Sequence, residues 1–134
     1  MQRLVTEFPE SELQLPARYW LAEAAFRLTN YVDAGKQFTS LSNDIGEFDA
    51  AWVPMVPLRQ AQCLAHEEQW AEALAIAQGI GERFPSFRQL YEADYVMGRC
   101  LSMQARFVTG SVIFGVASVL AAYRIVGGIE HKMV

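Results

Sequence analysis

Apolar residues recur at helical spacing over residues 17–28 and again over residues 31–41. Spacings of three and four residues are typical of an amphipathic helix with one buried side. Thr29 and Asn30 separate the two stripes, and a cluster of turn-forming residues at 42–46 ends the second. The pattern therefore predicts a helical hairpin. Its stripes are formed by Ala17, Trp20, Leu21, Ala24, Ala25 and Leu28, and by Tyr31, Ala34, Phe38 and Leu41.

A second pair of stripes lies between residues 50 and 80. Pro54 and Pro57 interrupt the start of its first helix, so the regular helix is expected to begin near Pro57. Residues 66–68 form the predicted turn, and the second helix is expected to end at Gly81 or shortly after. The stripes consist of Leu58, Ala61, Leu64 and Ala65, and of Trp70, Ala73, Leu74, Ala77 and Ile80.

Residues 90–103 predict the first helix of a third hairpin, and residues 104–106 its turn. No charged residue occurs from position 107 to position 123. No stretch alternates apolar and polar residues beside a hairpin turn, so strands are not predicted. The chain is thus expected to be all-α, with a helical domain over 1–106 and an apolar C-terminal helix over 107–134.

The three predicted hairpins share a pattern of small and aromatic residues. Each has a small residue in its first helix, an aromatic residue after its turn, and a second small residue in its second helix. Small residues let two helices approach closely, and one hairpin cannot bury its own apolar side, so neighbouring hairpins must stack. The matching sets, spaced by 39 and then 37 residues, are Ala22, Ala61 and Gly98; Tyr31, Trp70 and Phe107; and Ala34, Ala73 and Gly110.

This pattern resembles the tetratricopeptide repeat (TPR), a helix–turn–helix unit of roughly 34 residues. The resemblance covers residues 8–118, and the Phe-Pro-x-Ser motif at 8–11 with Tyr-Trp-Leu-Ala-Glu-Ala at 19–24 is similar to the bacterial Tol–Pal-associated and outer-membrane-assembly subgroup. It implies a right-handed α-α superhelix of about three hairpins, whose first helices line a concave face that binds a protein or peptide. The longer spacings and the prolines of the second hairpin depart from the family pattern.

The resemblance also places particular side chains on that concave face. By this reading Tyr19 and Tyr95 could stack on a bound peptide, and Arg99 could pair with an acidic group. The alternative is a solvated helix face with the tyrosines partly in the core. The predicted partner-contacting residues are Tyr19, Glu23, Arg27, Gln62, His66, Tyr95, Arg99 and Met103.

No cluster of residues in the sequence indicates catalysis, a metal site or a cofactor. His66, Glu67 and Glu68 are adjacent, so their side chains point in different directions and a solvated turn is expected. Cys63 and Cys100 lack the spacing of a zinc site or a disulfide framework and are expected to be buried core residues. Gly-rich phosphate loops and nucleophile elbows are absent from the sequence. The prediction is therefore a protein that is not an enzyme.

The charge of the chain disfavours nucleic-acid binding. Its formal net charge is −4, and residues 1–106 carry nine basic and fourteen acidic side chains, a balance of −5. The N-terminal residues lack the apolar run of a signal peptide, so the chain as it stands is predicted to be cytoplasmic. Residues 3–8 resemble the end of a helix, which raises the expectation of further repeats outside this chain.

The apolar stretch 107–123 leaves three interpretations open. It can be the last repeat helix, buried against a segment outside this chain, or a membrane anchor over 107–126, near the lower length limit of a span. The third is a reading frame that departs from its ancestral sequence near Arg106. The predicted function is accordingly a non-enzymatic scaffold that binds a peptide or partner helix, and the alternative is a tail-anchored membrane adaptor with a TPR-like domain.

Overall fold

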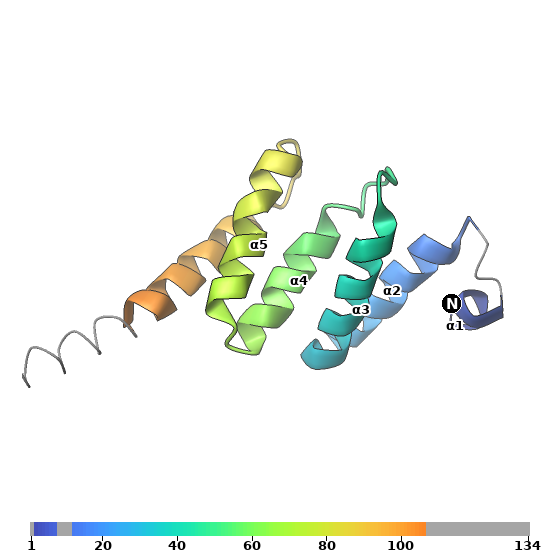
Figure 1. Ribbon diagram of the computed structural model, residues 1–134, viewed down its shortest axis with the longest axis horizontal. Helices are drawn as coiled ribbons and strands as arrows, with labels where there is room; N and C mark the ends of the chain where they lie inside the picture. The colour runs from blue at the N-terminus through green and yellow to red at the C-terminus, as the bar shows by residue number, and fades with distance from the viewer. Residues whose placement is uncertain (1, 8–11, 107–134) are drawn as a thin grey trace, which may run out of the picture. The chain divides into compact units, whose positions relative to one another are not determined.

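The computed structural model describes residues 2–7 and 12–106, and every regular element in this part of the chain is a helix (Figure 1). The prediction of an all-α fold is confirmed. The predicted second helix of the third hairpin, within 107–134, lies outside the described residues. The helices are α1 (Gln2–Glu7), α2 (Gln14–Arg27), α3 (Tyr31–Ile45), α4 (Met55–His66) and α5 (Trp70–Arg83), followed by a helical stretch over 90–106.

Each labelled helix packs against the next one along the chain. α2 contacts α3, α3 contacts α4 and α4 contacts α5, while smaller contacts join α1 to α2 and α2 to α4. Figure 1 shows α2 to α5 following one another in this order. The chain separates into two units, residues 1–101 and 102–134, and the packing described here is that within residues 1–101.

Pairs of fully buried alanines lie inside the two hairpins. Ala22 of α2 and Ala34 of α3 belong to one core cluster, and Phe38 of α3 fills the same cluster. Ala61 of α4 and Ala73 of α5 occupy the matching places in a second cluster. Because a methyl group is the smallest apolar side chain, the two helices of each hairpin can pack closely at these positions. The pairs predicted from the sequence are therefore brought together in the structure.

Replacing Ala34 by Leu is expected to lower the free energy of unfolding by roughly 1–3 kcal/mol, because the larger side chain overfills a fully buried site between two packed helices. Ala75→Leu on the exposed side of α5 is the matched control, and it should change stability by less than about 0.5 kcal/mol. Thermal or urea unfolding of both variants measures the effect. Equal midpoints for Ala34→Leu and the unsubstituted chain would mean that α2 and α3 do not pack through this residue.

The two hairpin turns share one backbone conformation, 39 residues apart. Their central residues, Thr29 and Glu68, have left-handed φ angles of 63° and 61°. The amide of Asn30 donates to the carbonyl of Ala25 over 3.0 Å, and the equivalent bond 39 residues later measures 2.9 Å. This bond spans the helix end and the left-handed residue, as in the common motif that ends a helix and redirects the chain.

The prolines set the start of α4, as the sequence predicts. Pro54 is the residue before the helix, Met55 begins it, and Pro57 lies in its first turn. The first turn of a helix tolerates proline because its amide groups have no partner within the helix. Before α4 the chain forms successive turns, in which the amide of Val53 donates to the carbonyl of Ala50 over 3.1 Å.

Two details of the sequence prediction are wrong. Residues 104–106 are helical and do not form a turn, since Gln, Ala and Arg are good helix formers and no glycine or asparagine interrupts them. In α2, Trp20, Ala24 and Leu28 are exposed although they were assigned to the buried stripe. Because α2 contacts both α3 and α4, its buried arc is turned toward α4 and includes Tyr19 and Glu23 instead.

No helix within the described residues is both long and apolar enough to cross a membrane. The span suggested over 107–126 lies outside these residues. A tail-anchored membrane adaptor therefore remains a hypothesis based on the sequence.

Candidate interaction surface

A buried carboxylate on α2 is held by an arginine of α4. The side chain of Glu23 is 3% exposed and that of Arg59 16%. The guanidinium of Arg59 donates from Nε to Oε2 of Glu23 over 2.9 Å and from Nη2 to Oε1 over 2.7 Å. Such a two-pronged arrangement fixes both side chains and satisfies both carboxylate oxygens. It joins the first helices of two successive hairpins directly.

The same arginine extends the contact toward the third first helix. Nη1 of Arg59 donates to Oε1 of Gln62 over 2.8 Å, and Nε2 of Gln62 donates to Oε2 of Glu92 over 3.2 Å. The Arg59 guanidinium also lies 4.3 Å from the centre of the Phe26 ring. Desolvation alone would lower the pKa of Arg59, but the hydrogen bonds and charge of Glu23 outweigh it and raise that pKa. Arg59 is therefore a permanent cation at the centre of a polar ladder across the first helices.

Helical spacing places further side chains beside this ladder. Arg27 follows Glu23 by four residues, His66 follows Gln62 by four, and Arg99 follows Glu92 by seven, so each shares a side of its helix with a ladder residue. We call this set the first-helix surface. It comprises Glu23, Arg27, Arg59, Gln62, His66, Glu92 and Arg99.

Aromatic rings border the surface at the hairpin turns. The imidazole of His66 stacks on Tyr31, with 3.7 Å between ring centres and 4° between planes. Arg99 lies 5.7 Å from the centre of the Trp70 ring. Desolvation, and after it the charge of Arg99, lowers the pKa of His66. At neutral pH the imidazole is thus a neutral, stacked ring, and Arg99 supplies the positive charge here.

Tyr19 is a core residue and not part of the exposed surface. Its side chain is 4% exposed and stacks on Trp52, with ring centres 4.9 Å apart. Burial, and after it the charge of Glu23, raises the pKa of its hydroxyl. The expected exposure of Tyr19 and Glu23 is therefore wrong: the hairpin that follows covers both, because Trp52 and Arg59 reach back onto α2.

The other residues predicted to contact a partner keep solvent exposure to different degrees. Arg27 has a largely exposed side chain, 3.5 Å from Glu23, while Gln62 is half-buried in the ladder. Tyr95 and Arg99 are exposed, and Met103 is half-buried within the unit that begins at residue 102. That a partner contacts these residues remains a prediction.

Arg59 is the functional candidate that sequence reasoning missed. It lies outside the apolar stripe of α4, and its partner Glu23 is 36 residues away. No spacing rule connects such residues until the hairpins are stacked. An available signal was a pair of opposite charges one helical turn apart when the first helices are aligned, since Arg59 corresponds to position 20 and Glu23 lies three residues further on.

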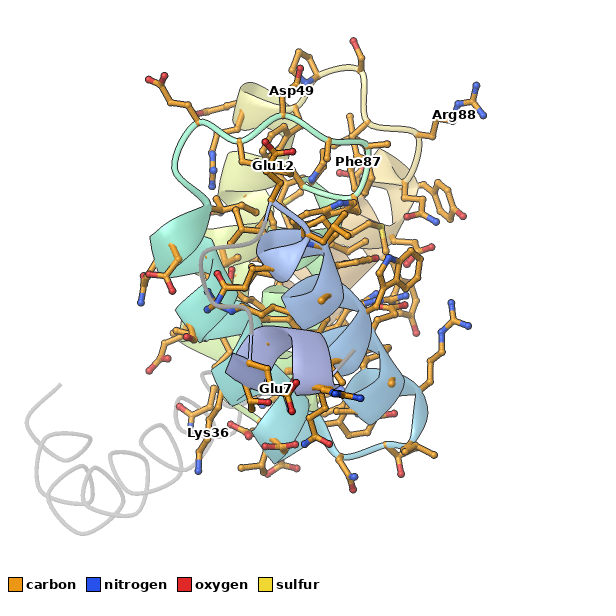
Figure 2. The ribbon with its side chains drawn as sticks, turned by 90° about the vertical axis from the view of Figure 1, so that its right-hand side faces the viewer. Glu7, Glu12, Lys36, Asp49, Phe87 and Arg88 are labelled. Atoms are coloured by element: carbon orange, nitrogen blue, oxygen red, sulfur yellow. The ribbon has the colours of Figure 1, made fainter. Side chains whose placement is uncertain are left out.

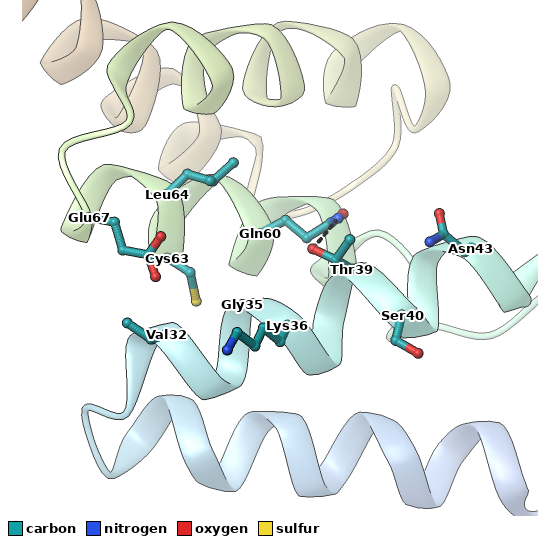
Figure 3. A pocket seen from close by; sticks show the side chains of 10 residues that line it. All are labelled: Val32, Gly35, Lys36, Thr39, Ser40, Asn43, Gln60, Cys63, Leu64 and Glu67. Atoms are coloured by element: carbon teal, nitrogen blue, oxygen red, sulfur yellow. Dashed lines mark hydrogen bonds between the residues drawn. The ribbon is translucent and has the colours of Figure 1, made fainter.

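A cavity of about 520 Å³ between α3 and α4 offers no catalytic arrangement (Figure 3). Its polar lining includes Lys36 and Glu67, and Nε2 of Gln60 donates to Oγ1 of Thr39 over 3.4 Å. Burial raises the pKa of the Cys63 thiol to about 12, so this lining residue stays protonated and a poor nucleophile.

Both cysteines are free and buried, as the sequence predicts. Burial raises the pKa of Cys100 as well. Among residues 2–7 and 12–106 there is no group of three or more His, Cys, Asp or Glu residues placed to hold a metal ion. No protein-family model, curated protein or solved structure matches this chain at a significant level. The first-helix surface is therefore the feature from which a function can be inferred.

Proposed function

We propose that this chain is a non-enzymatic, TPR-like interaction module that binds a peptide or a partner helix along the first-helix surface. The observation that carries the proposal is the ladder from Glu23 through Arg59 and Gln62 to Glu92. It makes one continuous surface out of three first helices. Stacking in a right-handed superhelix is part of the same proposal.

The ladder favours binding because it fixes the surface before a partner arrives. Side chains already held by hydrogen bonds lose little rotamer freedom on binding, so less of the contact energy is spent on ordering. The buried groups Glu23 and Arg59 are satisfied by each other and leave the outer groups free to contact a ligand. Arg27 and Arg99 are those outer groups, since both are exposed at the border of the ladder.

The composition of the surface supports a protein partner. Arginine and aromatic residues are enriched at protein interfaces and contribute much of the binding energy there. Arg99 provides an arginine next to an aromatic residue, because its guanidinium lies over the ring of Trp70. Within the described residues no carboxylate pairs with Arg99, so its charge is available to an acidic group of the ligand.

Replacing Arg99 by Ala is expected to weaken binding of a peptide selected by display on this chain by roughly tenfold or more. The physical reason is the loss of an arginine that is exposed, held over an aromatic ring and not paired with any carboxylate of the described residues. Titration calorimetry with the selected peptide measures the change.

Lys36→Ala is the matched control for Arg99→Ala, because Lys36 is an exposed cation of α3 (Figure 2) that lines the cavity between α3 and α4 and does not belong to the first-helix surface. Its removal should leave the affinity within about twofold. If Lys36→Ala weakened binding more than Arg99→Ala did, the partner would occupy the α3 side and the proposal would fail.

A further inference from the structure

The helix that contains residues 90–101 carries two exposed tyrosines on the side opposite its core residues. Tyr91 is 65% exposed and Tyr95 69%. The buried residues of the same helix are Ala93, Val96 and Cys100. The two rings therefore lie at the surface of this helix and do not belong to the hydrophobic core of the described residues.

Helical spacing aligns the two tyrosines with Arg99. Tyr91, Tyr95 and Arg99 follow one another at intervals of four residues, so they lie along one side of the helix at steps of about 6 Å. Tyr95 also follows Glu92 by three residues, so these three side chains continue the first-helix surface. We call them the Tyr–Tyr–Arg stripe.

The first-helix surface has a formal charge opposite in sign to that of the rest of residues 1–106. It contains three arginines and the two carboxylates of Glu23 and Glu92, a balance of +1. Residues 1–106 together balance at −5, so the remaining residues of that range carry −6. A positive surface on a negative molecule favours the acidic part of a ligand over a basic one.

On the basis of the proposed function, we propose that the ligand is an acidic peptide with one carboxylate on Arg99 and two aromatic or apolar residues on Tyr95 and Tyr91. Arginine and tyrosine are the residue types that contribute most to binding at protein interfaces. A tyrosine ring offers a large contact area and loses little conformational entropy when it is fixed.

The steps of the stripe also set the spacing of the peptide residues. An extended peptide advances about 6–7 Å every two residues, and a peptide helix advances about 6 Å every four. Either conformation matches the distance from Arg99 to Tyr95 and from Tyr95 to Tyr91. The acidic residue and the two apolar residues of the ligand are therefore expected at equal intervals along its sequence.

Double-variant cycles between the full chain and a peptide selected on it by display test each contact. Changing the acidic residue of the peptide to its amide should weaken binding to the unsubstituted chain roughly tenfold, but binding to Arg99→Ala by less than about twofold. Changing an aromatic residue of the peptide to Ala should behave in the same way with Tyr95→Ala. Leu101→Ala is the matched control, since Leu101 is 52% exposed on another side of the same helix and should not alter the affinity.

The outcomes separate this inference from the proposed function. Selected peptides without an acidic residue, or an affinity unchanged by both Tyr91→Ala and Tyr95→Ala, would overturn the acidic–aromatic ligand. The proposed function would still stand if Arg99→Ala weakened binding of such peptides more than Lys36→Ala. If display yielded no binding peptide, or Lys36→Ala had the larger effect, the proposed function and this inference would both fail.

Discussion

Arg59→Met is expected to lower the free energy of unfolding by about 3–5 kcal/mol. Methionine keeps much of the aliphatic volume but removes both hydrogen bonds to Glu23, whose carboxylate is 3% exposed. A buried carboxylate without its cation must be left unsatisfied, drawn into water or protonated, and each of these costs stability. Urea unfolding at neutral pH measures the effect.

Two further variants show whether the pair itself is responsible. Arg27→Met removes an exposed cation 3.5 Å from the same carboxylate and should cost less than about 1 kcal/mol. Glu23→Gln combined with Arg59→Met should be less destabilising than Arg59→Met alone, since no buried charge remains. With Glu23→Gln also measured alone, a double variant that loses the sum of the Glu23→Gln and Arg59→Met effects would show that Glu23 and Arg59 do not interact.

Tyr19→Ala is expected to cost about 3–5 kcal/mol, the range typical of removing a buried aromatic ring. The ring contacts Trp52 at 4.9 Å and Phe38 at 6.2 Å, so its loss opens a cavity between the first hairpin and the loop that leads to the second. The assignment of Tyr19 to a peptide-binding face predicts the opposite result, a loss of binding with unchanged stability.

Tyr19→Phe is the matched control, because it keeps the ring and removes only the hydroxyl. The ring contacts with Trp52 and Phe38 remain in this variant, so the loss should stay below about 1 kcal/mol. Thermal unfolding of Tyr19→Ala and Tyr19→Phe distinguishes a core position of the Tyr19 ring from an exposed one. A Tyr19→Ala variant as stable as Tyr19→Phe would place the ring outside the core.

Local pattern was sufficient to predict the first two hairpins. The small residues Ala22 and Ala34, the turn after Arg27 and the start of α4 beside its prolines all depend on residues a few positions apart. Helical periodicity, turn chemistry and proline geometry act over that same range. In the first two hairpins, the helices predicted from these rules are therefore placed to within a few residues.

Contacts between hairpins could not be predicted from helical periodicity, turn chemistry or proline geometry. Glu23 is polar and was assigned to the exposed side, yet α4 covers it and supplies Arg59. Which arc of α2 is buried depends on the angle at which the next hairpin stacks. Helical periodicity within one helix does not determine that angle. The candidate surface was accordingly predicted in outline, with Arg27 and Arg99 exposed and Tyr19 misplaced.

The central claim, that the first helices form the binding surface, is tested most directly by NMR of the isotope-labelled chain titrated with a selected peptide. We expect the shifted signals to belong to residues of α2, α4 and 90–101, with Arg27, His66 and Arg99 among the largest changes. Shifts confined to α3 and α5, around Lys36 and the exposed side of Ala75, would contradict the claim.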